Sequence, residues 1–409
     1  MNKSTRFLAA SAAFICAATL QAQAQTPPPA PLPTVRAEVG NPLKEAETLL
    51  IAKKPAEALA KIAEAEKIAN RTPYENFIIE RMRAGAALGA GDDALAFKSL
   101  AAAAESGMLT TEESPKIHDA VARIAYRSKD YPNAILWAER TQKLPGANPD
   151  LQSLIVNSQY FSKDYVATLK GLRAIVAEME TRGTKPPEDR LRMWAASANQ
   201  LKDDKAYVAA LEKLAVNYPK TEYWADLLYR VDNAPGFSEK LILDAYRLRL
   251  AAGALTKSNQ YFEMASILSA AAFPAEAQQV IDKGVAAGLW GGGAESARAQ
   301  KLRETVARDL KDEQARGHST PPKTAIAYMN NGMDQVVKGD AAKGLALMEQ
   351  AITLPDQKRP DEAKLRLGIA YVAAGNNARA EEIFKTVRGG EGLSELARAW
   401  MLFAQRGGK

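Results

Sequence analysis

DEAKLRLGIAYVAAGNNARAEEIFKTV, residues 361–387, is the stretch that decides the fold. Leu367, Gly368 and Tyr371 share one face of a predicted helix, which Gly375 and Asn376 interrupt. The next helix repeats this arrangement at helical spacing with Ala380, Phe384 and Val387. The small residues Gly368 and Ala380, one on each helix, let the two helices approach closely. The larger side chains fill the space around this contact. Such a hairpin cannot bury its apolar face alone, so it predicts neighbours of the same kind.

The same frame occurs once more, 36 residues earlier. The positions Lys364, Gly368, Gly375, Ala380, Phe384 and Val387 correspond to Tyr328, Gly332, Gly339, Gly344, Met348 and Ala351. The pattern resembles the tetratricopeptide repeat family, as a degenerate, exported bacterial member. The resemblance assigns repeat packing to Leu367, Gly368, Tyr371, Ala380 and Phe384. Lys364 departs from the family, which usually has a large aromatic residue there, whereas Tyr328 keeps it.

More blurred copies of the hairpin extend towards the N-terminus. Their breaks are marked by Pro55, Asp93, Tyr131, Tyr165 and Tyr207, in steps of 38, 38, 34 and 42 residues. We find no sustained alternation that would predict strands. The sequence therefore predicts an all-α fold of about nine hairpin repeats in two blocks. The family resemblance implies a right-handed superhelical solenoid of antiparallel hairpins.

Five segments are predicted along the chain. They are a signal peptide (1–24), a proline-rich linker (25–41), N-terminal tetratricopeptide-like repeats (42–290), a hinge or bridging helix (291–323) and C-terminal repeats with a terminal capping helix (324–409). The linker is either a stiff extended spacer or a disordered tail, and both readings stay open. Residues 291–323 could instead form one ordinary repeat with a longer loop. Arg398 is expected to face solvent on the capping helix.

The first 24 residues have the features of a secretory signal. Lys3 and Arg6 precede an apolar run, and Ala22-Gln23-Ala24 supplies a small-x-small cleavage site after Ala24. The apolar run is too short for a transmembrane anchor. Cys16, the single cysteine, lies inside the signal, so the mature chain is expected to lack disulfides. We therefore predict export to a bacterial periplasm.

Charge argues against nucleic acid as a partner. Removing the signal takes away two basic residues and lowers the net charge from +6 to +4, which is mild for this length. Charges of both signs alternate along the predicted helices, which is typical of solvated faces. No other apolar run approaches the roughly 20 residues of a membrane span.

No catalytic or metal-binding constellation stands out, so we predict no enzyme, no cofactor and no metal site. The two histidines, His118 and His318, lie far apart in the sequence, and no cysteine joins them in the mature chain. The glycines from Gly85 to Gly91 are better explained by a turn than by a phosphate-binding loop. Neighbouring carboxylates such as Glu112 and Glu113 are expected at a helix start or on an exposed face.

The family resemblance implies that the first helix of each hairpin lines a concave side. The candidate partner-binding residues there are Arg123, Tyr126, Asn157, Tyr160, Arg192 and Asn199. In the C-terminal repeats the same side is apolar, with Ile326, Met329, Met333, Leu365, Ile369 and Val372. That apolar set could clamp a helix of a partner, or it could pack against the last helix of the chain.

The leading hypothesis is a non-catalytic periplasmic scaffold or adaptor that binds a protein or peptide through the concave face. The alternative is a cell-envelope assembly factor that binds peptidoglycan or another envelope polymer. An enzyme whose active site the repeat helices carry is a third, weaker hypothesis. A shared fold argues for the first only by analogy, because such folds serve many partners.

Overall fold

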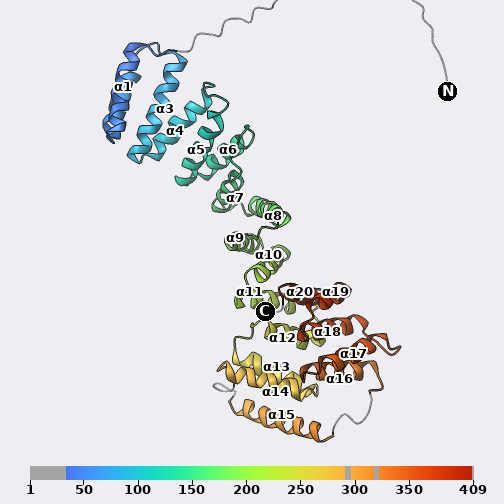
Figure 1. Ribbon diagram of the computed structural model, residues 1–409. Coiled ribbons are helices and arrows are strands. Elements are labelled where there is room, and N and C mark those ends of the chain that lie inside the picture. Colours follow the sequence, from blue (N-terminus) through green and yellow to red (C-terminus); the bar gives the residue numbers. More distant parts are fainter. Residues whose placement is uncertain (1–33, 291–295, 317–321, 408–409) are drawn as a thin grey trace, which may run out of the picture. The chain divides into compact units, whose positions relative to one another are not determined.

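A computed structural model describes residues 34–290, 296–316 and 322–407. These residues form twenty α-helices and one short 3-10 helix, with no strand among them (Figure 1). The predicted signal peptide with its cleavage site, Cys16, most of the proline-rich segment and His318 lie outside the described residues. The all-α prediction is confirmed.

The helices follow one another with short connections. Their bounds are α1 Ala37–Ile51, α2 Pro55–Glu66, α3 Pro73–Ala90, α4 Asp93–Glu105, α5 Glu113–Arg127, α6 Tyr131–Gln142, α7 Leu151–Phe161, α8 Tyr165–Thr181, α9 Glu188–Gln200, α10 Asp204–Asn217, α11 Thr221–Asp232, η1 Glu239–Leu241, α12 Ile242–Ala251, α13 Ser258–Ala270, α14 Pro274–Ala286, α15 Ser296–Arg316, α16 Ala325–Val337, α17 Ala341–Thr353, α18 Pro360–Ala373, α19 Asn377–Phe384 and α20 Leu393–Gln405. Consecutive helices pack in pairs, and within each unit contacts such as α2 with α3, α8 with α9 and α17 with α18 stack one pair on another.

Eight hairpins share one turn geometry. The residue with a positive φ in each turn is Lys53, Gly91, Lys129, Lys163, Lys202, Ala272, Gly339 or Gly375. In the α7–α8 turn, the Lys163 N–H donates to the Tyr160 carbonyl and the Asp164 N–H donates to the Gln159 carbonyl. These two backbone hydrogen bonds end the first helix. The Asp164 carboxylate then accepts from the Ala167 N–H at 3.0 Å and begins the second helix.

Two predicted boundaries were wrong by a few residues. Helix α10 begins at Asp204, because the Asp203 carboxylate accepts from the Ala206 N–H at 3.0 Å, so the marker at Tyr207 was three residues late. Helix α1 begins at Ala37, whereas we expected the first repeat near Pro42. Pro42 lies inside α1, where it removes one backbone donor and its ring crowds the carbonyl of the preceding turn.

The chain divides into two compact units, one ending at Ser114 and the other running from Pro115 to Lys409. The first unit holds α1–α4, and its core includes Val39, Leu43, Ile62 and Ile79. The second unit holds α5 from Pro115 and all later helices, including those on both sides of residues 291–323. Within residues 291–323, helix α15 packs on α13 and α14 through the buried Ala299 and Val306.

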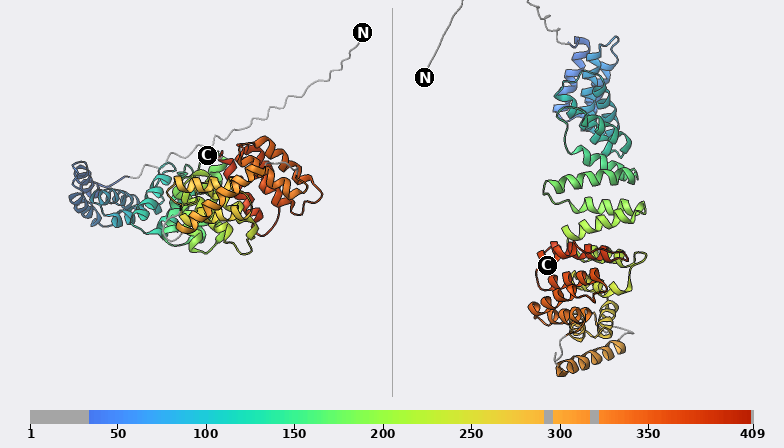
Figure 2. Two further views of the ribbon diagram at one scale, coloured as in Figure 1. Left: turned by 90° about the horizontal axis from the view of Figure 1, so that it is seen from below. Right: turned by 90° about the vertical axis from the view of Figure 1, so that its right-hand side faces the viewer.

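In the second unit the C-terminal helices turn back onto the middle ones. Figures 1 and 2 show the red helices α18–α20 beside the green and yellow helices α11 and α12. Helix α20 contacts α10 and α11 as well as its neighbour α19. The rings of Trp224 and Phe403 meet edge to face with centroids 5.7 Å apart. Arg398, expected to face solvent, is 57% exposed and pairs with Glu212 of α10.

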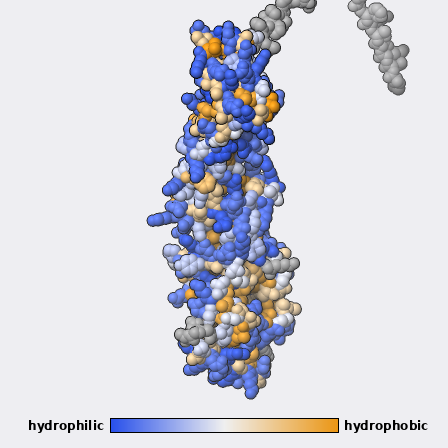
Figure 3. Space-filling model, turned by 90° about the vertical axis from the view of Figure 1, so that its left-hand side faces the viewer, coloured by the Kyte–Doolittle hydropathy of each residue, from blue (hydrophilic) through white to orange (hydrophobic). Residues whose placement is uncertain are grey.

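The structure places the motif residues of the deciding stretch in one core. Leu367 is 2% exposed, Phe384 is 3% exposed and Ala380 is fully buried, while Tyr371 packs beside them. A Cβ built on Gly368 would lie 2.4 Å from Phe384 Cε1, so the glycine permits the close contact of α18 with α19. On the face drawn in Figure 3, hydrophilic side chains predominate and hydrophobic ones appear in separate clusters.

Candidate functional site

The sequence-predicted face is formed by α5, α7 and α9 of the second unit. Arg123 and Tyr126 lie on α5, Asn157 and Tyr160 on α7, and Arg192 and Asn199 on α9. Tyr126, Tyr160 and Asn199 occupy matching positions three residues before the positive-φ residue of their turns. They therefore lie at the turn end of the helices, whereas Arg192 lies about two helical turns away from that end.

The polar members of this face have local partners. Both Asp119 oxygens accept from Arg123 Nε at 3.0 Å. Asn157 accepts from Arg190 Nη1 at 2.7 Å, which ties α7 to α9. Arg192 is exposed, and its charge helps Lys220 and Tyr223 to hold the pKa of Glu188 below its usual value. The structure brings Asn157 together with a residue of the next hairpin that the sequence analysis did not name.

Two predicted tyrosines belong to a cluster of five rings. Tyr126 contacts Tyr131 and Phe161, with centroids 5.9 and 6.4 Å apart. Phe161 stacks on Tyr131 at 5.5 Å and meets Tyr160 edge to face at 5.7 Å. Tyr160 in turn contacts Tyr165 at 5.9 Å. The side chain of Phe161 is 51% exposed, so the cluster presents an apolar surface across two hairpins.

A second site lies where the C-terminal helices meet the middle ones. Two cavities of about 500 and 570 Å³ share Ile326, Met329, Arg359 and Arg366 in their walls. We call the space formed by both cavities the trench. Its walls come from η1, α12 and α13 on one side and from α16, α17 and the start of α18 on the other. Such volumes are typical of ligand sites.

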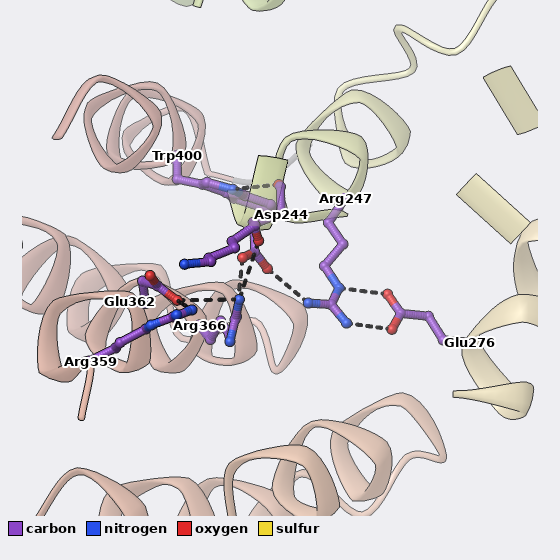
Figure 4. Close-up of polar contacts among 8 residues, drawn as sticks. Asp244, Arg247, Glu276, Arg359, Glu362, Arg366 and Trp400 are labelled. Carbon is purple, nitrogen blue, oxygen red and sulfur yellow. Dashed lines mark hydrogen bonds and ion pairs between the residues drawn. The ribbon is translucent and has the colours of Figure 1, made fainter. Parts of the chain in front are cut away.

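A buried ionic cluster forms one end of the trench (Figure 4). Arg247 donates to Glu276 from Nε at 2.8 Å and from Nη2 at 2.7 Å, and to Asp244 from Nη1 at 2.8 Å. Arg366 Nε donates to the other Asp244 oxygen at 3.1 Å. Trp400 Nε1 donates to the Asp244 carbonyl at 3.1 Å. The cluster therefore joins α12, α14, α18 and α20.

Electrostatics favour the charged form of Arg247. Burial alone would lower the pKa of Arg247, but the carboxylates of Glu276 and Asp244 outweigh burial and raise it above its ordinary value. Asp244 is fully buried and Arg247 is 7% exposed. Removing any one partner would leave a buried charge uncompensated, which is costly.

The apolar set predicted on the C-terminal repeats separates into three groups. Ile326 is 67% exposed at the trench, and Met329 and Met333 line it. Ile369 and Val372 line another cavity of about 330 Å³ beyond Arg247. Leu365 is fully buried. Most of the set therefore borders cavities that face α12–α14.

Sequence reasoning missed several residues of both sites. Phe161 has no counterpart at its position in the neighbouring turns, so helical periodicity gave it no role. Asp244, Arg247 and Glu276 each lie on a helix, and a charged residue on a helix of a globular protein normally faces solvent. A buried charge shows a sequence signal only as a charged residue on an otherwise apolar face, as Asp244 illustrates at helical spacing from Leu241 and Leu248.

Among the described residues, no three His, Cys, Asp or Glu side chains are grouped to hold a metal. Within the same residues, no helix combines the length and the apolar character needed to span a bilayer.

No family model matches the chain, and no curated protein matches it. Among solved structures, it is similar to the tetratricopeptide repeat domain of P58(IPK), with 13% sequence identity and a TM-score of 0.23. The alignment covers 91% of this chain and 98% of that one. At this identity and TM-score the likeness carries no argument, so the conclusions above rest on the helices and side chains alone.

Proposed function

We propose that the chain is a tetratricopeptide-like, non-catalytic scaffold that binds a protein or peptide partner through the face of α5, α7 and α9. The observation that carries this proposal is the five-ring cluster with its half-exposed Phe161. Large rings at the centre of an interface contribute much of the binding free energy. Arg123 and Asn157 add hydrogen-bonding groups on α5 and α7, and Arg192 adds another further along α9.

A double substitution tests this face. Arg123→Glu with Tyr160→Ala should abolish recovery of the partner when the tagged protein is used to capture proteins from a periplasmic fraction. Arg123 is exposed and Tyr160 is only partly buried, so the melting curve should change little. Lys170→Glu on the exposed side of α8 is the matched control and should leave recovery intact. An unchanged interaction in the double variant would rule out this face.

We further propose that the protein acts in a bacterial periplasm after cleavage behind Ala24. Mass spectrometry of the protein from a periplasmic extract should give a mature chain that begins at Gln25. Recovery of the uncut chain from the cytoplasm would contradict this location.

The envelope-polymer alternative draws on the same rings, because sugars also pack on aromatic surfaces. The face-to-face contact of Tyr131 with Phe161 leaves only part of each ring available, which favours an apolar side chain as the ligand. Co-sedimentation with purified peptidoglycan separates the two proposals. Pelleting that the double variant loses would favour the polymer.

A further inference from the structure

We propose that the five-ring cluster of α5–α8 binds the proline-rich segment Gln25–Pro33 of a second copy of this chain. The segment reads QTPPPAPLP and lies outside the described residues. The inference rests on the proposed function, because it names an occupant for the aromatic part of the same face. Three properties of the rings favour this occupant: their hydroxyl groups, their spacing and the charge around them.

The cluster presents hydrogen-bond donors that the chain itself does not use. Its four tyrosines are partly exposed, and no hydroxyl among them has a hydrogen-bond partner within residues 34–290, 296–316 and 322–407. Elsewhere in the second unit, by contrast, the hydroxyls of Tyr207, Tyr218 and Tyr371 each donate to an acceptor of the chain. The cluster therefore combines apolar rings with donors that are available to an external acceptor.

A proline-rich segment has the complementary set of groups. Proline has no backbone N–H, so the run Pro27-Pro28-Pro29 offers carbonyl acceptors without donors. In the polyproline II conformation that such runs favour, these carbonyls have no partner within the segment. Grooves lined by aromatic side chains recognise this kind of ligand. An amphipathic helix bonds its own backbone groups, so it would leave the tyrosine hydroxyls without acceptors.

The spacing of the rings fits a ligand with three residues per turn. The tyrosine pairs of α5–α6 and α7–α8 each meet edge to face with centroids 5.9 Å apart, and Phe161 contacts both pairs. In polyproline II, Pro28 and Pro31 face the same side about 9 Å apart, so each can pack against one ring pair. The whole segment extends about 28 Å. This length is enough to cross successive ring contacts that are each 5.5–5.9 Å long.

The charge around the cluster favours an uncharged ligand. In the turns beside the rings, Lys129 is followed by Asp130 and Lys163 is followed by Asp164, so the signs cancel within each turn. A surface without excess charge of either sign gives no advantage to a charged ligand. Residues 25–35 contain no Asp, Glu, Lys or Arg, so the segment matches this surface.

We assign the segment to a second copy because its own end is anchored at the first unit. Only residues 34–36 separate it from α1, and Arg36 Nε donates to Glu75 at 2.9 Å. The cluster belongs to the second unit. Contact between two copies makes no demand on the link between the units of one molecule. Repetition of this contact gives head-to-tail chains of molecules.

Sedimentation velocity of the mature chain, residues 25–409, measures this association. We expect the weight-average sedimentation coefficient to rise with concentration between about 5 and 200 μM. An excess of synthetic peptide with the sequence of residues 25–35 should return the protein to monomer, because the peptide occupies the rings. The same peptide with Pro28→Ala and Pro31→Ala should compete at least about tenfold less well.

Variants of the protein test each side of the contact. Pro28→Ala with Pro31→Ala changes no described residue and should remove the dependence on concentration. Phe161→Ala removes the ring that contacts both tyrosine pairs and should weaken association about tenfold or more. The Phe161 side chain is 51% exposed, so the melting curve should change little.

Replacing all four cluster tyrosines by phenylalanine tests the hydroxyl groups alone. The variant combines Tyr126→Phe, Tyr131→Phe, Tyr160→Phe and Tyr165→Phe. Every ring remains, so the melting curve should stay unchanged while association weakens severalfold. Tyr229→Phe is the matched control, because Tyr229 is 58% exposed on α11, and it should change neither property. Full association of the fourfold variant would contradict a ligand recognised by its carbonyl groups.

Other results would also overturn the inference. These are a monomer at every concentration, association that survives the loss of both prolines, or association that survives Phe161→Ala. The proposed function is tested separately by capture of a partner with Arg123→Glu and Tyr160→Ala. A monomeric mature chain whose double variant loses its partner would refute only the inference. Self-association through the prolines and Phe161, with capture unchanged in the double variant, would refute only the proposed function.

Discussion

At the scale of single residues, Gly344 is a position where a methyl group would collide with backbone atoms. A Cβ built there would lie 2.5 Å from the Gly332 carbonyl oxygen and 2.8 Å from the Val336 nitrogen. Backbone atoms cannot move aside as a side chain would. Gly344→Ala should therefore lower the free energy of unfolding of the second unit by about 2 kcal/mol or more, measured by urea denaturation.

Gly85→Ala is the matched control for this experiment. Gly85 is exposed in the middle of α3, and a Cβ there meets no atom within 4 Å. Alanine should raise helix stability there by about 0.5–1 kcal/mol. If both variants shifted stability in the same direction, the close contact of α16 with α17 would not explain the effect.

Glu75 gives the first unit a pH dependence. Its carboxylate accepts from Arg36 Nε at 2.9 Å and from the Thr72 N–H at 2.8 Å, and these bonds lower its pKa from 4.5 to about 2. The pKa of Glu75 is lower in the folded state than in the unfolded state. Its contribution to the stability of the first unit is therefore complete above about pH 4.5 and is lost as the pH falls towards 2. Thermal melts of the full chain, followed by circular dichroism as the pH is lowered, should show this loss. Glu75→Gln should remove that part of the pH dependence.

Some residue roles could be predicted from the sequence and others could not. Gly368 and Phe384 repeat at the positions of Gly332 and Met348, so periodicity alone indicated their close packing. Phe161 depends on Tyr131 of the preceding hairpin for its environment, and no repeat position records that contact.

At the scale of elements, each hairpin depends on its turn. Asp164 begins α8 by accepting from the Ala167 N–H at 3.0 Å. Asp164→Ala should destabilise the second unit by about 1 kcal/mol, because the N–H loses its acceptor. Asp164→Asn keeps an acceptor oxygen and should retain most of the stability in the same thermal melt. Equal losses in both variants would show that charge, and not capping, dominates at this turn.

The turns also explain which boundaries were predictable. Lys129-Asp130-Tyr131 and Lys163-Asp164-Tyr165 match residue for residue, so their register was clear from the sequence. In Lys202-Asp203-Asp204 the tyrosine is missing, and Tyr207 three residues later was taken in its place. Either of the two adjacent aspartates could cap the helix. Backbone conformation decides between them, and periodicity does not describe it.

At the scale of the whole second unit, the ionic cluster holds distant helices together. Removing Arg247 leaves the buried carboxylates of Asp244 and Glu276 without their shared partner. Arg247→Ala should lower the free energy of unfolding by about 3–5 kcal/mol. Tryptophan fluorescence during denaturation measures this loss, since Trp224 and Trp400 are buried nearby in the same core.

Arg398→Ala is the control of the same type at an exposed position. Its side chain is 57% exposed, and its Nη2 donates to Glu212 Oε2 at 2.7 Å. An exposed ion pair contributes about 1 kcal/mol or less. Comparable losses in Arg247→Ala and Arg398→Ala would contradict the special role given to the buried cluster.

The turning back of the C-terminal helices lay beyond sequence reasoning. Local periodicity identified α18, α19 and α20 as helices with apolar faces, and it left open what those faces contact. The partners of Arg366 and Trp400 are 122 and 156 residues away along the chain. Periodicity carries no information at that separation.

These long-range contacts also set an order of events during synthesis. Helices α10–α12 leave the ribosome well before α20 is synthesised. Until then, the side of Trp224 that contacts Phe403 is exposed to solvent. Arg398 must then find Glu212 across 186 residues, which is slow compared with closing a hairpin. Until that happens the nascent chain exposes apolar helix faces, the state in which multi-repeat chains associate wrongly and chaperones bind them.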